Sequence, residues 1–281
     1  MSHYGFELKR VSTLEDVDGS GKHYHNYKGV HFYYRKNHES DRLIVTFNGA
    51  MYRDPCSPTG MVLLPIFRGY DWKYNVLCMS DKLLEDFSDK KLELGWFLSP
   101  VGSNYQQIYT EIMTHVIKSH TDVIFHGSSA GGFPALHYAC VFSKKALVLN
   151  AQFYMQRYSL FPHFTRTTEM NLTHDFDEHD LEAIISKYGP PLRAHICCNA
   201  NDINHMDNHF IPFKQFVEND EREKLKEKIT FTTFSNKEAP PLGKTHHHVI
   251  LPTGVSMNAM FDELFRSESI ALICEIDHKI K

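Results

Sequence analysis

The segment Gly127-Ser128-Ser129-Ala130-Gly131 places a serine between two glycines, each two positions away from it. This spacing fits the G-x-S-x-G pattern, in which a serine sits on a tight turn between a strand and a helix. Small flanking residues let the strand and the helix approach closely, and the helix N-terminus favours developing negative charge. The pattern therefore predicts Ser129 as a nucleophile, with the backbone N–H of Ala130 as one oxyanion donor.

A nucleophilic serine needs a base that takes its proton and a carboxylate that orients the base. Asp202 follows the apolar run at residues 195–198, and open parallel sheets gather their functional groups at the carboxyl ends of the strands. Asp202 is therefore the favoured acid, and Asp207 in the same loop is the alternative. After the last apolar run, the only histidine cluster is His246-His247-His248, and His247 or His248 is favoured as the base.

The histidines allow a second interpretation, in which the cluster at 246–248 joins His205 and His209 around a metal ion. His205 and His209 are four residues apart, which would place both on one face of a helix. However, the sequence lacks the glutamate of an H-E-x-x-H site, and adjacent loop histidines seldom bind one ion together. We therefore expect no metal and no bound cofactor, with two histidines of the triplet exposed to solvent.

The elements that must position these residues follow an alternating pattern. From residue 28 onward, apolar runs of strand length alternate with longer amphipathic segments, which is typical of a mostly parallel sheet with helices on both faces. The predicted strands are residues 30–34, 43–47, 75–79, 123–125, 146–149, 195–198 and 229–234. The predicted helices are residues 82–87, 105–119, a segment ending near 143, 180–187 and 255–265. The first two strands are predicted to form an antiparallel pair, and the fold class is α/β.

One domain is predicted over residues 1–281, because the alternating pattern continues to the last helix and the sequence has no internal repeat. Residues 153–193 interrupt this pattern with an aromatic and charged stretch, which predicts an insertion or lid. Arg157 and Arg166 lie within it and are not easily buried without partners. Both are candidates for contact with an anionic substrate.

The composition excludes several classes of protein. The 281 residues are 42% hydrophobic and 23% charged, with a net charge of −4, which argues against general nucleic-acid binding. No window of about 18 uncharged apolar residues is present, so no transmembrane segment is expected. The first ten residues lack the order of a signal peptide, and the six cysteines include no C-x-x-C pair. These features predict a cytoplasmic protein and leave its oligomeric state open.

The order of strand, glycine-flanked serine, helix, later acid and still later histidine resembles the α/β-hydrolase superfamily over about residues 40–265. More narrowly, V-T-F-N-G at 45–49, H-G-S-S-A-G-G at 126–132 and C-N-A-N-D at 198–202 are similar to serine-triad O-acetyltransferases of bacterial capsular polysaccharides. The superfamily resemblance implies a second oxyanion donor in the turn after the early strand, at Gly49, Ala50 or Met51.

The resulting prediction is an acyl-transfer enzyme that forms an acyl intermediate on Ser129. The narrower resemblance implies acetyl-CoA as the donor and a saccharide or polysaccharide hydroxyl as the acceptor. One alternative is an esterase of the same fold, in which water accepts the acyl group. The other is a catalytically silent module that binds a saccharide or a protein through residues 153–193.

Overall fold

The structure is a computed structural model that describes residues 2–3, 6–17, 19–50, 72–87, 92–100, 102–170, 180–221, 223–236, 251 and 255–266. The chain divides into two compact units. The first consists of Met1–Val123 with Ser159–His179, and the second of Ile124–Tyr158 with Asp180–Lys281. The predicted insertion at 153–193 is therefore distributed over both units.

The strands of the first unit follow the order β1-β2-β3-β4-β6-β5. They are β1 (Ser2–His3), β2 (Phe6–Arg10), β3 (Ser20–Tyr27), β4 (Val30–Arg35), β5 (Arg42–Phe47) and β6 (Asn75–Met79). The helices described in this unit are η1 (Leu14–Asp16), α1 (Lys82–Asp86), α2 (Tyr105–Ile117) and α4 (Phe161–Thr168). The pairs β2–β3 and β5–β6 are parallel, whereas β1–β2, β3–β4 and β4–β6 are antiparallel.

The predicted antiparallel pair between residues 30–34 and 43–47 is wrong. β6 lies between β4 and β5 and pairs with both. Every residue of β6 is buried, so this apolar strand needs a neighbour on each edge for its backbone groups. The short link between β4 and β5 therefore passes over one strand instead of forming a hairpin.

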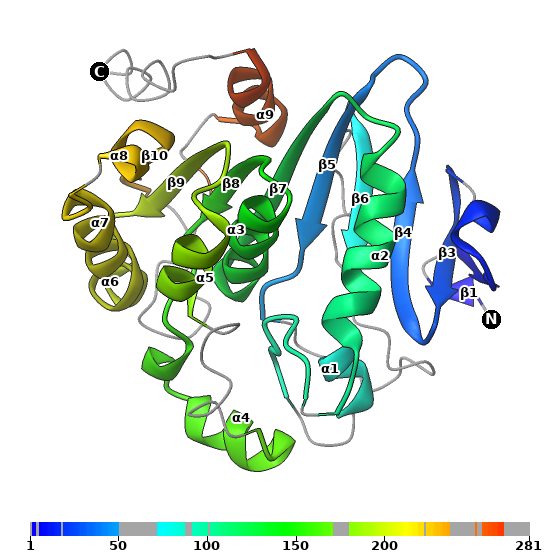
Figure 1. Ribbon diagram of the computed structural model, residues 1–281, viewed down its shortest axis with the longest axis horizontal. Helices are drawn as coiled ribbons and strands as arrows, with labels where there is room; N and C mark the ends of the chain where they lie inside the picture. The colour runs from blue at the N-terminus through cyan, green and yellow to red at the C-terminus, as the bar shows by residue number, and fades with distance from the viewer. Residues whose placement is uncertain are drawn as a thin grey trace. The chain divides into compact units, whose positions relative to one another are not determined.

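Helix α2 lies beside this sheet (Figure 1). Its buried residues Ile108, Ile112 and Val116 recur at the helical spacing that predicted the helix. The hydroxyl of Tyr109 accepts a hydrogen bond of 2.8 Å from the backbone N–H of Lys82, at the first residue of α1. Apolar packing on one face fixes α2 against its neighbours, together with this contact and the ion pair of 2.7 Å between Glu111 of α2 and Lys28.

The strands of the second unit follow the order β7-β8-β9-β10, and all three pairs of neighbours that this order contains are parallel. They are β7 (Asp122–Ser128), β8 (Lys145–Leu149), β9 (Arg193–Asn199) and β10 (Ile229–Phe234). The helical elements are η4 (Ser129–Gly131), α3 (Gly132–Val141), η5 (Met155–Arg157), α5 (Leu181–Tyr188), α6 (Ile203–His205), η7 (Met206–Phe210), α7 (Ile211–Glu218), α8 (Lys224–Lys228) and α9 (Met257–Arg266). β8 and β9 are almost wholly buried, which explains their continuous apolar runs.

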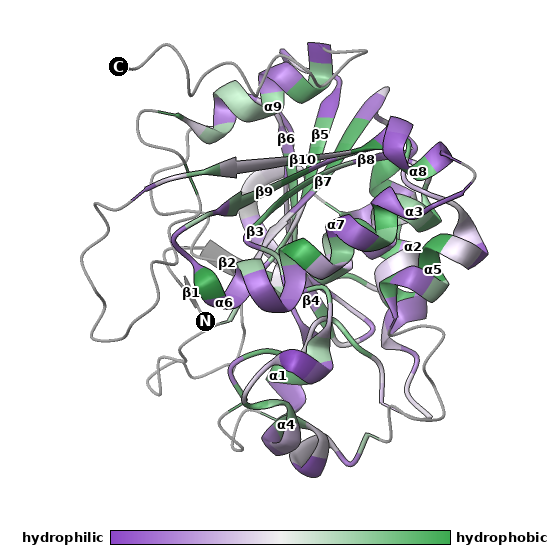
Figure 2. Cartoon of the chain, turned by 90° about the vertical axis from the view of Figure 1, so that its left-hand side faces the viewer, coloured by the Kyte–Doolittle hydropathy of each residue, from purple (hydrophilic) through white to green (hydrophobic). Residues whose placement is uncertain are grey.

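Helices cover both faces of β7, as predicted. Phe125 stacks on Phe142 at the end of α3, whereas the ring of the next residue, His126, packs edge-on against Phe261 of α9. Consecutive residues of a strand point to opposite faces, so α3 and α9 lie on opposite sides of the strand. α9 shows the alternation of hydrophilic and hydrophobic residues that this position requires (Figure 2). Among the described residues, no helix has the length and apolar character needed to cross a membrane.

Asp81 is a buried carboxyl group at the N-terminus of α1. It accepts hydrogen bonds of 3.1 Å from the backbone N–H groups of Leu83 and Phe97. Burial nevertheless dominates and raises the pKa of Asp81 from 3.8 to about 7, although the two backbone hydrogen bonds act in the opposite direction. The folded chain therefore holds the proton of Asp81 more tightly than the unfolded chain does.

This difference predicts a pH-dependent stability. The contribution of Asp81 is fully present below about pH 4, where the group is protonated in both states, and is lost as the pH rises through about 7. The free energy of unfolding should therefore fall less steeply between pH 5 and 8 in Asp81→Asn than in the unchanged protein. Urea unfolding at several pH values measures it, with the exposed Asp207→Asn as the control. Parallel pH profiles for all three proteins would contradict the prediction.

Candidate active site

Ser129 lies at an abrupt turn between β7 and α3. β7 ends at Ser128, a single 3₁₀ turn covers Ser129–Gly131, and α3 begins at Gly132. The backbone of Ser129 has φ of +53°, in the left-handed region that non-glycine residues rarely adopt. A strained backbone held by its surroundings at such a turn is typical of a nucleophile elbow. Ser129 is a buried residue, with 8% of its surface exposed.

Two glycines make this turn possible. A Cβ atom on Gly127 would lie 2.0 Å from the carbonyl oxygen of Gly131, and one on Gly132 would lie 2.2 Å from Cβ of Ala151. The first contact is with backbone, which cannot move without opening the turn. Glycine is therefore required at position 127 because the strand and the helix approach closely there, as predicted. Gly132 marks a second close approach, to Ala151, and lies outside the five-residue G-x-S-x-G pattern.

The backbone of Ser129 is fixed by the segment that follows β8. Its N–H donates to the carbonyl oxygen of Asn150 over 3.1 Å, and its carbonyl accepts the N–H of Gln152 over 2.9 Å. Asn150 is fully buried, and its side-chain oxygen accepts the backbone N–H of Asn199 over 2.7 Å. One residue thus connects the serine turn to the end of β9.

Asp202 lies just beyond the end of β9 and is fully buried. It forms the N-cap of α6, because Oδ1 accepts the backbone N–H of His205 over 3.3 Å. The side-chain amide of Asn150 approaches Oδ2 to 3.5 Å. Asn150 therefore contacts Ser129 through its backbone and Asp202 through its side chain. The predicted nucleophile and the predicted acid are thus both in contact with Asn150. The alternative acid, Asp207, is exposed.

His205 is the histidine that approaches Asp202 among the residues that the structure describes. Its Nδ1 lies 2.9 Å from Oδ2 of Asp202, and both side chains are almost completely buried. From the sequence alone, His205 was predicted only as a possible metal ligand. The signal that could have revealed this contact is the D-x-x-H spacing directly after a strand, since an N-cap and the third residue of the helix lie side by side.

His209 follows one turn later, in the π-helical segment η7. Its ring centroid is 5.7 Å from that of His205. Nδ1 of His209 accepts the backbone N–H of Tyr154 over 3.3 Å, and burial lowers the pKa of His209 to about 3. No group of three or more potential metal ligands occurs within the part of the chain that the structure describes.

The remaining candidates are distributed as follows. Ala130 is buried directly after Ser129, whereas Gly49 and the exposed Ala50 follow β5 in the first unit.

Arg157 is exposed in the second unit, with its guanidinium 4.5 Å from the ring centroid of Tyr154. Arg166 is exposed in the first unit, where Nε donates to the carbonyl of Pro162 in its own helix over 3.1 Å. Met51 and the histidines at 246–248 lie outside the described residues.

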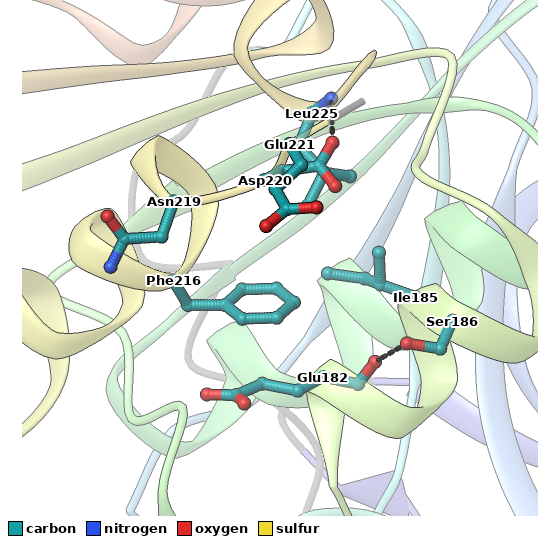
Figure 3. A pocket seen from close by; sticks show the side chains of 8 residues that line it. All are labelled: Glu182, Ile185, Ser186, Phe216, Asn219, Asp220, Glu221 and Leu225. Carbon is teal, nitrogen blue, oxygen red and sulfur yellow. Dashed lines mark hydrogen bonds between the residues drawn. The ribbon is translucent and has the colours of Figure 1, made fainter. Parts of the chain in front are cut away.

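A cavity of about 530 Å³ also lies in the second unit. Its lining is formed by Glu182, Ile185, Ser186, Phe216, Asn219, Asp220, Glu221 and Leu225 (Figure 3). Of the predicted site residues that the structure describes, none lines this cavity. One of its acidic residues, Glu182, accepts the hydroxyl hydrogen of Tyr154 over 2.8 Å, so one wall of the cavity touches the residue that stacks on His209.

The fold is similar to those of solved α/β-hydrolase enzymes. The capsule O-acetyltransferase of Neisseria meningitidis serogroup A is 18% identical, with a TM-score of 0.54 over 76% of this chain and 86% of that chain. Esterase B from Lactobacillus rhamnosis is 12% identical, with a TM-score of 0.53 over 95% of this chain and 87% of that chain. No family model and no curated protein matches the sequence.

These likenesses confirm the predicted fold class. At such low identities they establish a shared backbone arrangement and leave the reaction open. The chain therefore has the α/β-hydrolase fold, which it shares with an esterase and a capsule O-acetyltransferase.

The close approach at Gly127 makes a prediction for folding. Gly127→Ala forces Cβ against the carbonyl of Gly131, so the free energy of unfolding should fall by roughly 1–3 kcal/mol or more. Urea unfolding measures the change. The neighbouring Ser128→Ala is the control, because a small half-buried side chain is shortened there without a new contact. Equal unfolding midpoints for Gly127→Ala and the unchanged protein would show that β7 and α3 can separate freely.

Proposed function

We propose that the protein is a serine-dependent acyltransferase that moves an acetyl group from acetyl-CoA to a saccharide hydroxyl. The observation that carries this proposal is the strained turn at Ser129, joined through Asn150 to the buried carboxylate of Asp202. Further support comes from the shared fold with a capsule O-acetyltransferase and from the three sequence motifs that resemble such enzymes.

In the first step, Oγ of Ser129 attacks the thioester carbonyl carbon while a histidine takes the hydroxyl proton. We assign this base to the cluster at 246–248, with His247 or His248 favoured. The C–S bond then breaks, and the leaving thiolate receives the proton. The N–H of Ala130 and an N–H from Gly49, Ala50 or Met51 stabilise the negative oxygen that forms between these events.

In the second step, a saccharide hydroxyl attacks the acetyl carbon on Ser129. The same histidine takes the hydroxyl proton and returns it to Oγ as the C–Oγ bond breaks, so the serine is regenerated. Asp202 holds the base in the correct tautomer and stabilises its charged form. Arg157, which is exposed beside Tyr154, is the candidate for binding an anionic part of either substrate.

Hydrolysis is the second candidate, because the esterase with the same fold aligns with 95% of this chain. The two reactions share the acyl-enzyme and differ in whether the site excludes water and positions an alcohol.

Ser129→Ala should reduce acyl transfer by about 10³-fold or more, because the nucleophile is removed while the binding groups stay in place. Ser128→Ala, one residue earlier, should keep nearly full activity. Release of CoA from labelled acetyl-CoA measures both variants. Full activity of Ser129→Ala would overturn the mechanism.

The same assay separates the candidate functions. Incubation of the unchanged protein with labelled acetyl-CoA should place an acetyl group on Ser129, detectable by mass spectrometry of its peptide, and label should move to an added capsule-type oligosaccharide. Release of acetate at the same rate with and without saccharide would favour the esterase. If the folded protein neither forms the acetyl-enzyme nor reacts with a fluorophosphonate probe, it is a silent binding module.

The base assignment is tested by replacing His246, His247 and His248 one at a time by alanine. One variant, at 247 or 248, should lose about 10³-fold in kcat, since only one imidazole can face the serine. The other two variants serve as matched controls for the loop. Near-full activity in all three variants would place the base elsewhere in the chain.

A further inference from the structure

Asn150, which follows β8, combines a special backbone conformation with a buried amide. Its backbone has φ of +43°, a left-handed conformation that asparagine, aspartate and glycine adopt more readily than most residues. Its carbonyl accepts the N–H of Ser129 over 3.1 Å. Its fully buried side chain contacts Asn199 and Asp202. This side chain takes no part in the two chemical steps above.

The orientation of the Asn150 amide is fixed by a backbone group. Oδ1 of Asn150 accepts the N–H of Asn199 over 2.7 Å, and a backbone N–H only donates. The amide oxygen is therefore used at the end of β9, and the NH2 group is turned toward Asp202, with Nδ2 at 3.5 Å from Oδ2. An amide NH2 group only donates, so the direction of this hydrogen bond does not depend on a protonation state.

Asn199 is itself held in place, so it is a fixed neighbour for Asn150. It is the last residue of β9 and is fully buried. Its Oδ1 accepts the backbone N–H groups of Asn201 and Asn236 over 3.1 and 3.3 Å. Its Nδ2 donates to the carbonyl of Asn236, just after β10, over 3.2 Å. Two buried amides therefore join the ends of β8, β9 and β10, and Asn150 cannot turn without losing its bond to Asn199.

We propose that Asn150 is a positioning residue of the active site, acting through its side chain. The amide NH2 group holds Oδ2 of Asp202 at a fixed place relative to Ser129, whose turn is held by the backbone of the same asparagine. His205 also approaches this oxygen, with Nδ1 at 2.9 Å. The role rests on the proposed function, because Asn150 affects catalysis through Asp202.

Two substitutions separate the donor from the other features of Asn150. Asn150→Asp keeps the size, the tolerance of a positive φ and an oxygen for the N–H of Asn199, but it replaces the donor to Asp202 by a second carboxyl oxygen. Asn150→Gly accepts the positive φ and keeps the backbone carbonyl, but it has no side chain. Both variants should lose about 10- to 100-fold in kcat at about pH 9, with KM nearly unchanged, because the acid is no longer held.

The pH dependence of activity separates the two variants from each other. Two facing carboxyl groups repel when both are ionised, so they share one proton at lower pH. The shared proton restores a hydrogen bond between residues 150 and 202, and this bond is lost as the pH rises. The activity of Asn150→Asp relative to the unchanged protein should therefore increase by about 5-fold or more from about pH 9 to about pH 6. The ratio for Asn150→Gly should stay constant, since His205 and the base are the same in all three proteins.

Release of CoA from labelled acetyl-CoA gives kcat and KM. The rate at which a fluorophosphonate probe labels Ser129 is a second readout, which does not depend on the acyl donor. Asn75→Asp is the matched control, because Asn75 is a buried amide in the first unit whose Oδ1 accepts the backbone N–H of Asn37 over 2.8 Å. It should lower the free energy of unfolding, measured with urea, and keep kcat.

A double substitution covers the case in which Asn150→Asp does not fold. Asn150→Gly should reduce kcat further by less than about 3-fold when Asp202→Ala is already present, since residues that act through one another are not additive.

Two results would overturn the inference. Full activity of folded Asn150→Asp at every pH would show that the contact with Asp202 has no catalytic effect. Losses that do not change with pH and that add fully to that of Asp202→Ala would show a purely structural role. Failure of the proposed function looks different, because the unchanged protein would then not react with the probe, or Ser129→Ala and Asp202→Ala would keep full activity.

Discussion

The close approach of β7 to the start of α3 at Gly127 is the constraint on which the second unit depends. With the carbonyl of Gly131 only 2.0 Å from where a Cβ of residue 127 would be, the strand passes into the helix with almost no connecting loop. The residue at the apex must then take a left-handed backbone, and that residue is Ser129. The strain is retained because Ser129 donates its N–H to the carbonyl of Asn150 and accepts the N–H of Gln152, which holds its backbone on both sides.

Asn150 extends this constraint to the neighbouring strands. It follows β8, its backbone N–H donates to the carbonyl of Cys197 over 2.8 Å, and its side chain contacts both Asn199 and Asp202. A fully buried amide must satisfy its hydrogen bonds within the protein, so its position is strongly determined. The carboxyl ends of β7, β8 and β9 are thereby locked together, as expected where a parallel sheet carries its functional groups.

The sequence predicted those features that depend on local spacing. The serine turn followed from its glycines, and the buried strands followed from continuous apolar runs. The strand order could not be predicted in this way, because the position of β6 between β4 and β5 depends on contacts between residues far apart in the sequence. Helix α4 was missed because its aromatic residues were interpreted as a lid, and η7 was missed because a π-helical turn has no simple periodic signal. The contact of His205 with Asp202 was not predicted, because the four-residue spacing of His205 and His209 indicated possible metal ligands instead.

The presence of His205 at Asp202 is compatible with a second histidine as the base. A carboxylate has about four lone-pair sites, so the backbone N–H of His205 at Oδ1 and the Asn150 amide at Oδ2 do not exhaust its capacity to accept hydrogen bonds. An N-cap also benefits from the ionised form, because the carboxylate at the start of a helix interacts favourably with the first N–H groups. Asp202 therefore caps α6 and is at the same time placed to act as the acid of the proposed triad. One carboxylate can serve both purposes because its N-cap hydrogen bond with the backbone N–H of His205 uses only part of its capacity to accept hydrogen bonds.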